Sequence, residues 1–148
     1  MKYATALYDT NIYIGYPHIT RAHPAGWFSS VVLAERLSSA GDKSRIKELL
    51  LFKLAYQADD RFLVPTDEAW VQAGLILNHY LSDLSRSNKQ RHRPADRDEE
   101  QTYNLIRDIL IAVSAKQNGV TVVSNNKDFA TIAKYYKFRH KTAEEFFG

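Results

Sequence analysis

Short runs of apolar and β-branched residues alternate along the chain with longer segments in which apolar residues recur at helical spacing. The short runs predict strands, because β-branched and aromatic residues favour extended backbone. We expect these strands at Lys2–Tyr8 and Val120–Val123, with a strand leading into a helix at Trp27–Leu33 and an edge strand at Lys137–Lys141. Arg61–Pro65 is a further brief apolar run that ends at a proline.

The longer segments predict helices, several of them preceded by residues that favour helix N-termini. Asp42 and the Asp9-Thr10-Asn11 segment are such residues, and Gly119 is suited to follow a helix C-terminus. We expect helices over Ile12–Ile14, Ala34–Ser39, Asp42–Gln57, Thr66–Ser85, Asp98–Asn118 and Phe129–Tyr136. In the third of these, the spacing of Ile46, Leu49, Leu50 and Leu54 indicates one apolar face.

Three segments lack either pattern. Gly15–Gly26 contains Pro17 and Pro24 and is predicted to be a loop, and Thr142–Phe147 is predicted to be a frayed tail. Arg86–Arg97 is rich in cations among serine, asparagine and proline. This cationic segment is either a rim that guides RNA toward a catalytic pocket or a solvated loop.

Short strands that alternate with helices predict an α/β domain with a mainly parallel sheet. At 148 residues the chain fits one domain, 1–148, with one core. No apolar run approaches the roughly 20 residues that span a bilayer, and Asp9 interrupts the N-terminal region where a signal peptide needs apolar residues. We therefore expect a cytoplasmic protein without a membrane partner.

Composition and charge restrict the possible chemistry. The chain has no cysteine, so a metal ion would be held by oxygen or imidazole ligands. Residues 1–85 contain 8 Lys and Arg against 9 Asp and Glu, whereas residues 86–148 contain 12 against 8. The basic second half is compatible with a polyanionic partner, and equally with an ordinary solvated surface.

Four acids occupy positions that could share one site. In parallel sheets, ligands bind beyond the carboxyl ends of the strands. Asp9 directly follows the first predicted strand, Asp128 follows Val120–Val123 by one turn, and Glu35 lies near the start of the helix after the second strand. Asp108 lies inside a helix in an otherwise apolar segment.

Each acid also has an ordinary explanation. Asp9 and Asp128 could serve only as helix N-caps, and Glu35 could be a solvated side chain on an amphipathic helix. Asp108 is two positions from Ile106 and from Leu110, so it could face water. The combination is more informative, because carboxylates 4 Å apart repel each other by roughly 4 kcal/mol per pair at an effective dielectric near 20.

A hard divalent cation is the usual partner of such a cluster when the ligands are all oxygen. Mg²⁺ lowers the pKa of a bound water and balances charge on a leaving oxygen, which suits phosphodiester hydrolysis. The acids therefore favour a metal-dependent nuclease. Neither a GxGxxG nor a P-loop pattern is present, and the histidines lack metal-ligand spacing.

Four segments of the sequence, in order, resemble the successive motifs of the PIN-domain family, and especially of the VapC-type toxins of toxin–antitoxin pairs. They are Asp9-Thr10-Asn11, Ser29 to Leu37 around Glu35, Asp108-Ile109-Leu110-Ile111-Ala112, and Val122 to Phe129. The resemblance implies a three-layer α/β/α fold, a Mg²⁺- or Mn²⁺-dependent endoribonuclease activity, a homodimer, and inhibition by an antitoxin whose tail covers the acidic pocket.

The resemblance also implies roles for individual residues. Asp9 and Asp108 would bind the metal most directly, and Glu35 would complete the first set of acids. The fourth position is either Asp128 or a water held by Asn126, because the family accepts Asp or Asn at the position of Asn126. Residues that would orient ligands or the scissile phosphate are Thr10, Asn11 and Ser124.

Two other functions remain open at this point. The chain could be a catalytically silent PIN-like module that binds RNA or a protein. It could also be a phosphatase with an aspartyl nucleophile after the first strand, although Asp9-Thr10-Asn11 lacks the second acid that the common aspartyl phosphatases have there. Tyr13, Tyr16 and Trp27 are expected to pack mostly in the core, with base stacking as the alternative.

Overall fold

The centre of the molecule is an all-parallel β-sheet, seen in a computed structural model that describes residues 5–22, 26–90 and 99–148. Within these ranges the sheet has five strands in the order β3-β2-β1-β4-β5. The strands are β1 Ala6–Tyr8, β2 Gly26–Ser29, β3 Phe62–Leu63, β4 Thr121–Val123 and β5 His140–Lys141. The predicted α/β class with a parallel sheet is confirmed, as is the edge position of β5.

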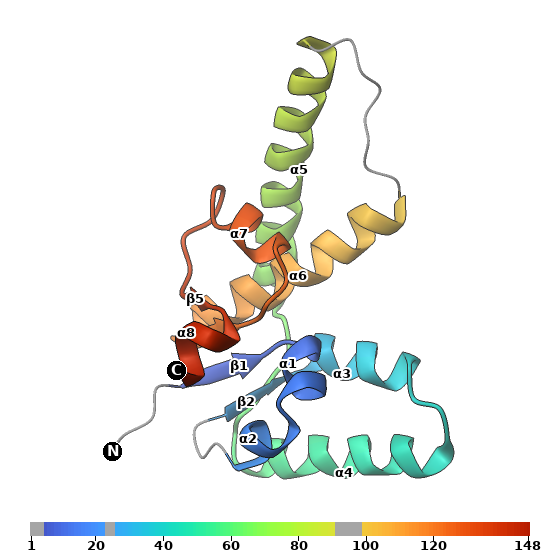
Figure 1. Cartoon of the computed structure of the whole chain (residues 1–148). Coiled ribbons are helices and arrows are strands. Elements are labelled where there is room, and N and C mark those ends of the chain that lie inside the picture. The colour runs from blue at the N-terminus through green and yellow to red at the C-terminus, as the bar shows by residue number, and fades with distance from the viewer. Residues whose placement is uncertain (1–4, 23–25, 91–98) are drawn as a thin grey trace.

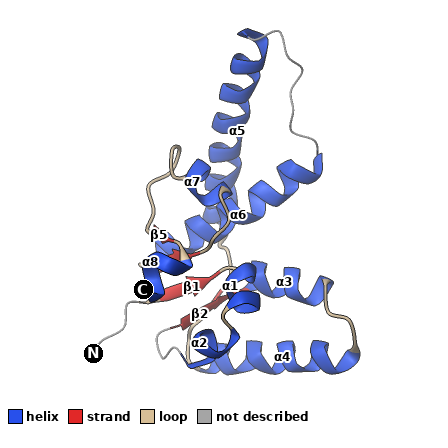
Figure 2. Ribbon diagram, in the orientation of Figure 1, coloured by secondary structure: helices blue, strands red, loops and turns tan. Residues whose placement is uncertain are grey.

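Helices flank both faces of the sheet and give the three-layer arrangement expected of the fold (Figures 1 and 2). They are α1 Thr10–Gly15, α2 Pro17–Ala22, α3 Ser30–Ser38, α4 Lys43–Ala58, α5 Asp67–Gln90, α6 Glu99–Gln117, α7 Asp128–Ile132 and α8 Ala143–Phe147. In Figure 1, α4 lies below β2 and α3 lies to the right of the strands, whereas α5 and α6 lie above β1. Among the described helices, none is both long and apolar enough to cross a bilayer.

The core forms around the central strands and α6. Tyr8, Phe28 and Phe129 are the largest side chains that are fully buried, and they come from β1, β2 and α7. From Leu105 onward α6 buries most of its residues, so its apolar side chains are packed on more than one face. Gly119 follows this helix with a φ of 66°, a left-handed conformation that glycine adopts without strain, as its predicted place after the C-terminus requires.

Two segments near the N-terminus differ from the sequence prediction. Residues 17–22 form α2, where a loop was predicted, because Pro17 takes the first helical position and its missing N–H is not needed there. Thr20 then donates its hydroxyl to the carbonyl oxygen of Tyr16 at 3.0 Å. α3 begins at Ser30 rather than at Ala34, because the Ser29 hydroxyl accepts a hydrogen bond from the Val31 N–H at 3.1 Å and caps the helix there.

The predicted apolar face of α4 is wrong except at Leu49. Leu49 and Tyr56 are buried, whereas Leu50 and Leu54 are 44% and 58% exposed. Both stripes have helical spacing, but the buried one carries aromatic rings that pack around Phe28, and Tyr56 lies 5.6 Å from it between ring centroids. The larger rings therefore decide which side of the helix faces the sheet.

Three boundaries toward the C-terminus also differ. α5 continues to Gln90, so the first residues of the cationic segment are helical, while residues 91–97 lie outside the described residues. α7 is shorter than predicted and ends at Ile132. The predicted frayed tail is α8, which Thr142 and Glu145 start with a reciprocal capping box.

The order of the strands creates a switch point between β1 and β4. The chain adds β2 and β3 on one side of β1, and later adds β4 and β5 on the other side. At such a point the connections leave in opposite directions and open a crevice beyond the carboxyl ends of the strands. Asp9 directly follows β1, and Ser124 directly follows β4. The Asp9 N–H donates to the carbonyl oxygen of Val123, the last residue of β4, at 3.1 Å.

Candidate active site

The four predicted acids line one cavity of about 320 Å³ beyond the carboxyl ends of β1 and β4. They reach it from different elements: Asp9 follows β1, Glu35 lies on α3, Asp108 lies on α6, and Asp128 begins α7. The complete lining is Asp9, Thr10, Asn11, Ile14, Glu35, Asn104, Arg107, Asp108, Asn126 and Asp128. We call this the acidic cavity.

Asp9 is 5% exposed and has both carboxylate oxygens engaged. The Thr10 N–H donates to Oδ1 at 2.8 Å, and the Ser124 hydroxyl donates to Oδ2 at 2.8 Å. Burial raises the pKa of Asp9, and these two hydrogen bonds oppose the rise because they favour the ionised form. Asp9 is therefore the N-cap of α1 and a wall of the acidic cavity at the same time.

Asp108 does not face water, although its offset from the apolar stripe of α6 allowed that expectation. It is 6% exposed, and the Asn126 side-chain amide donates to its Oδ2 at 3.1 Å. Its pKa is raised to about 8, mainly by burial and also by the negative charges of Asp9, Asp128 and Glu35, against the effect of Arg107. The ionised form of Asp108 is thus disfavoured by burial first and by the other three acids second.

Glu35 is partly buried and is held by the residue next to Asp9. The Thr10 hydroxyl donates to its Oε2 at 3.0 Å. Burial raises the pKa of Glu35, the Thr10 hydrogen bond lowers it, and the charge of Asp9 raises it. Thr10 therefore connects the acid of α3 to the segment that follows β1.

The turn after β4 is organised by Ser124 and Asn126. Ser124 is fully buried, and its hydroxyl accepts hydrogen bonds from the Asn126 N–H at 3.0 Å and from the Asn11 side-chain amide at 3.4 Å. The Asn126 side-chain oxygen accepts the Asp128 N–H at 3.0 Å. Asn126 therefore contacts Asp108 directly, and it also positions the start of α7, where Asp128 lies.

The family model of the PIN domain matches residues 17–135, more than half of the chain. The chain belongs to the PIN-domain family. The matched range includes Glu35, Asp108 and Asp128, while Asp9 lies on its N-terminal side. No curated protein matches the sequence.

Solved structures similar to this PIN domain include VapBC and FitAB complexes. DNA-bound VapBC from Salmonella typhimurium is 17% identical, with a TM-score of 0.51 and coverage of 94% of this chain and 98% of that chain. FitAB bound to an IR36 DNA fragment is 18% identical, with a TM-score of 0.50 and coverage of 93% and 94%. At these identities the likeness shows the fold alone.

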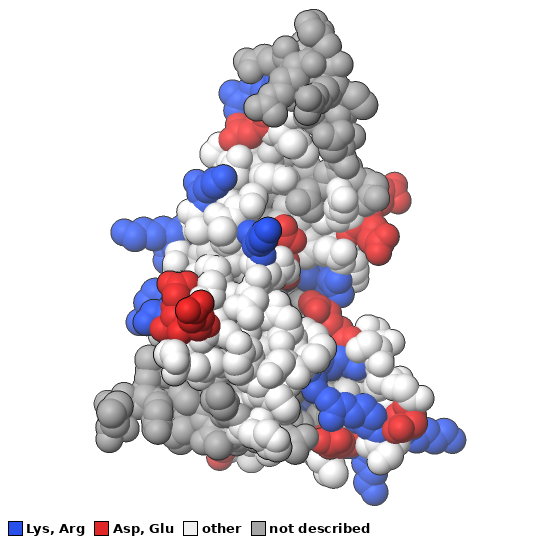
Figure 3. Space-filling view, viewed as in Figure 1, with Lys and Arg blue, Asp and Glu red and all other residues white. Residues whose placement is uncertain are grey.

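Three lining residues of this PIN domain were not among the predicted site residues: Ile14, Asn104 and Arg107. Arg107 is the single Lys or Arg among the described residues that line the acidic cavity. A signal for it exists in the sequence, since it is the one cation in the apolar segment around Asp108. On the face shown in Figure 3, acidic and basic residues adjoin between the regions of α6 and α3, and the described part of this face has no broad basic surface.

The aromatic residues considered for base stacking do not line the acidic cavity. Tyr13 is 7% exposed and packs edge-on against Tyr8, with ring centroids 5.8 Å apart. Tyr16 and Trp27 are partly buried against the core. Packing is their observed role.

A divalent metal is the cofactor that the PIN fold implies, and the donor chemistry of the acidic cavity fits one. The cavity offers carboxylate and amide oxygens, which hard cations prefer, and its acids raise the pKa of Asp108 in the absence of a cation. Within the part of the chain that the structure describes, however, no group of three His, Asp or Glu side chains lies close enough together to hold a metal as the side chains stand.

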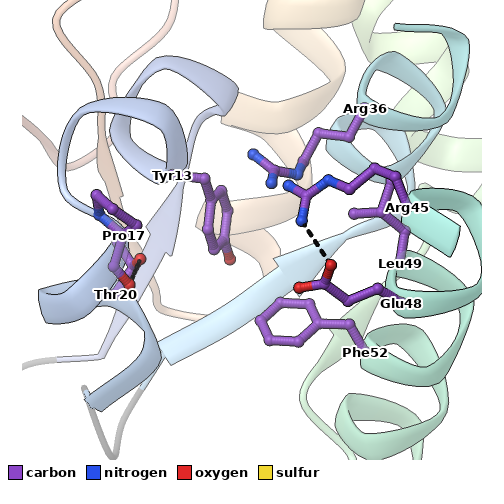
Figure 4. Close-up of a pocket in the computed structure, with 8 residues that line it drawn as sticks. All are labelled: Tyr13, Pro17, Thr20, Arg36, Arg45, Glu48, Leu49 and Phe52. Carbon is purple, nitrogen blue, oxygen red and sulfur yellow. Dashed lines mark hydrogen bonds and ion pairs between the residues drawn. The ribbon is translucent and has the colours of Figure 1, made fainter. Parts of the chain in front are cut away.

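A second cavity lies on the other side of α3 and has different chemistry (Figure 4). Its lining comes from α1, α2, α3 and α4: Tyr13, Pro17, Thr20, Arg36, Arg45, Glu48, Leu49 and Phe52. Its single acid, Glu48, pairs with Arg45 at 3.0 Å. Since this cavity brings no second carboxylate to Glu48, it is not suited to hold a divalent cation.

Proposed function

We propose that this PIN domain is a Mg²⁺- or Mn²⁺-dependent endoribonuclease. The observation that carries the proposal is the convergence of Asp9, Glu35, Asp108 and Asp128 on one cavity at the switch point of the sheet. Four carboxylates in one cavity repel one another, and this repulsion adds to the effect of burial in raising the pKa of Asp108. A divalent cation would offset the repulsion.

In this proposal Asp9, Asp108 and Glu35 would hold the metal. When bound, the metal supplies Lewis-acid polarisation of a phosphate oxygen and lowers the pKa of an attacking water. Ser124 and the Thr10 N–H orient the Asp9 carboxylate, the Thr10 hydroxyl orients Glu35, and Asn126 orients Asp108. These bonds fix the acids before substrate arrives, which limits the reorganisation needed during the reaction.

The fourth position is assigned to Asp128, with Asn126 as the residue that positions it. Both side chains line the acidic cavity. Asn126 already uses its amide N–H on Asp108 and its oxygen on the Asp128 N–H. Asp128 is therefore the better candidate for contact with a metal-bound water or with the leaving group.

The test is an RNA cleavage assay with and without EDTA, using wild type and the variants Asp9→Asn and Asp108→Asn. Each variant is expected to lose cleavage by roughly two orders of magnitude or more, because a metal contributes several kcal/mol to the transition state. Asn is itself a good N-cap, so Asp9→Asn is expected to keep α1 and the fold. Glu68→Gln on α5 is the matched control, since Glu68 is exposed and lies outside the acidic cavity.

Full cleavage by either variant, or cleavage that persists in EDTA, would contradict the assignment of the acids. Circular dichroism and thermal melts of the same preparations separate loss of chemistry from loss of fold.

We further propose that the protein is the toxin of a toxin–antitoxin pair, that it forms a homodimer, and that an antitoxin covers the acidic cavity. The printed descriptions of the similar structures support this, because they are VapBC and FitAB complexes. The test is co-expression with the product of a neighbouring small gene. The proposal expects a stable complex whose RNA cleavage is suppressed, and it fails if no adjacent gene product binds.

A catalytically silent PIN domain that binds RNA or a protein is the second candidate. The observation that favours it is that no three acids among the described residues stand close enough to share a metal. Isothermal titration with Mn²⁺ separates the two candidates. The nuclease requires saturable Mn²⁺ binding that Asp108→Asn abolishes, whereas the silent module predicts RNA binding without it.

A further inference from the structure

Arg107 brings a positive charge into a cavity that is otherwise lined by acids and neutral residues. It lies on α6, directly before Asp108 in the sequence, and its side chain is 31% exposed. Its neighbours hold the guanidinium in place: Nη2 donates to the Asn104 side-chain oxygen, and the Tyr103 ring centroid lies 5.3 Å from Cζ. The charge is therefore held at the cavity by two residues of its own helix.

The guanidinium forms only a long ion pair with one of the acids around it. Its Nη1 lies 3.9 Å from Glu35 Oε1, which is longer than a hydrogen bond. Its Nε is buried and has no hydrogen-bond partner. A fully paired structural counterion would use these donors on the protein, because an unpaired buried N–H is costly.

A polyanion that enters the acidic cavity needs such a cation. The four acids carry a formal charge of −4 when ionised, and Arg107 reduces this to −3. The negative field opposes the approach of RNA, while a guanidinium binds phosphate through parallel N–H donors. Arg107 is the described lining residue that can supply this contact.

We propose that Arg107 binds a phosphate of single-stranded RNA beside the acid cluster, with Tyr103 and Asn104 as the residues that position it. This rests on the proposed function, because it takes RNA as the substrate of the acidic cavity. Tyr103 is 64% exposed and lies one helical turn before Arg107, so its ring is accessible to solvent beside the guanidinium that it contacts.

The experiment measures binding separately from cleavage. A fluorescent, 2′-O-methylated single-stranded RNA is titrated by anisotropy in EDTA, over a series of KCl concentrations, against wild type, Arg107→Ala and Arg107→Lys. Arg107→Ala is expected to weaken binding roughly tenfold, as for loss of one charge-assisted hydrogen bond. The slope of log affinity against log salt is expected to fall by about 0.7, the value for one phosphate contact on a single strand.

Arg107→Lys keeps the charge but loses the fork of donors, so it is expected to retain the salt slope and to recover only part of the affinity. Arg45→Ala is the matched control. Arg45 lies on α4 outside the acidic cavity and pairs with Glu48 at 3.0 Å, so its removal changes the net charge equally but should leave binding within twofold. Thermal melts confirm that each variant is folded.

The outcomes distinguish this inference from the proposed function. If wild type cuts RNA but Arg107→Ala binds like wild type, or if Arg45→Ala loses as much affinity, the phosphate contact is wrong while the nuclease stands. If Arg107→Ala alone weakens binding but wild type never cuts with Mn²⁺, the contact stands and the nuclease fails. If Arg107→Ala is unfolded, the affinity of Arg107→Lys tests the proposal instead. Wild-type affinity in Arg107→Lys would exclude a contact in which parallel N–H groups of the guanidinium bind the phosphate.

Discussion

At the scale of single residues, several side chains of the acidic cavity both stabilise the local backbone and position an acid. Asp9 caps α1 and faces the cavity, and Asn126 joins Asp108 to the start of α7. Thr10 uses its backbone N–H on Asp9 and its hydroxyl on Glu35. Replacing any one of them therefore alters structure and site together, and conservative variants are the informative ones.

Asp108 makes the stability of the metal-free protein depend on pH. Its pKa in the folded protein is about 8, above its ordinary value of 3.8, so the folded state binds the proton more tightly. The stabilisation is complete below the ordinary pKa and is lost as the pH rises toward 8. Burial is the main cause of the raised pKa, the charges of Asp9, Asp128 and Glu35 raise it as well, and Arg107 lowers it.

Asp108→Asn should therefore stabilise the metal-free protein at pH 8.5 by roughly 2 kcal/mol or more, since one pKa unit corresponds to about 1.4 kcal/mol. The gain should shrink at pH 5, because the wild-type carboxyl is then protonated. Urea unfolding in EDTA at both pH values measures this. Equal stability of the two proteins at pH 8.5 contradicts the raised pKa of Asp108, and added Mg²⁺ should stabilise wild type but not the variant.

At the scale of elements, local capping decides where the acids lie. Ser29 is 1% exposed and caps α3, the helix that carries Glu35 to the acidic cavity. Its hydroxyl accepts the Val31 N–H at 3.1 Å, which fixes the helix start directly after β2.

Ser29→Ala is expected to reduce the free energy of unfolding by about 1 kcal/mol, as for other lost N-caps. Cleavage should also fall, because Glu35 would be less firmly held. Ser38→Ala at the other end of α3 is the control, since Ser38 is exposed and its hydroxyl bonds only a helix carbonyl. Chemical denaturation measures both; a loss at Ser38 equal to that at Ser29 would argue against the cap.

The sequence predicted the helices and strands that have local capping residues or that pack in the middle of the fold. β1, β4, α4, α6 and the parallel sheet were confirmed. The apolar face of α4 was wrong because two stripes have helical spacing, and only the packing around Phe28 selects between them. α8 was missed although Thr142 and Glu145 form a recognisable capping box.

For the acidic cavity, the rule that ligands bind beyond the strand ends brought Asp9, Glu35 and Asp128 together correctly. The burial of Asp108 could not be predicted from helical spacing, because α6 is buried on more than one face. Arg107 was missed because its one signal, a single cation in the apolar segment around Asp108, forms no spacing pattern. The metal, the chemistry and the roles of these residues stay predictions.

At the scale of the whole molecule, large apolar side chains remain exposed on α5. Trp70, Val71 and Leu75 are 53%, 63% and 62% exposed. Large exposed apolar side chains such as these are commonly covered by another protein, and tryptophan is enriched among residues that dominate interfaces. This surface is therefore suited to the proposed homodimer.

Trp70→Glu is expected to shift the purified protein from dimer to monomer in size-exclusion chromatography with light scattering, because it places a charge in the interface. Leu54→Glu on α4 is the matched control, since Leu54 is 58% exposed on a different helix. A dimer that survives Trp70→Glu but not Leu54→Glu would place the interface on α4 instead.

The contact between Ser124 and Asp9 joins residues that are 115 positions apart. During synthesis, β1 emerges from the ribosome long before its neighbour β4 and the Asn126 turn. Until then, the nascent chain carries Asp9 without the partners that orient it. Under the proposed function, a nascent chain that has not yet reached β4 would lack the arrangement of acids that RNA cleavage needs.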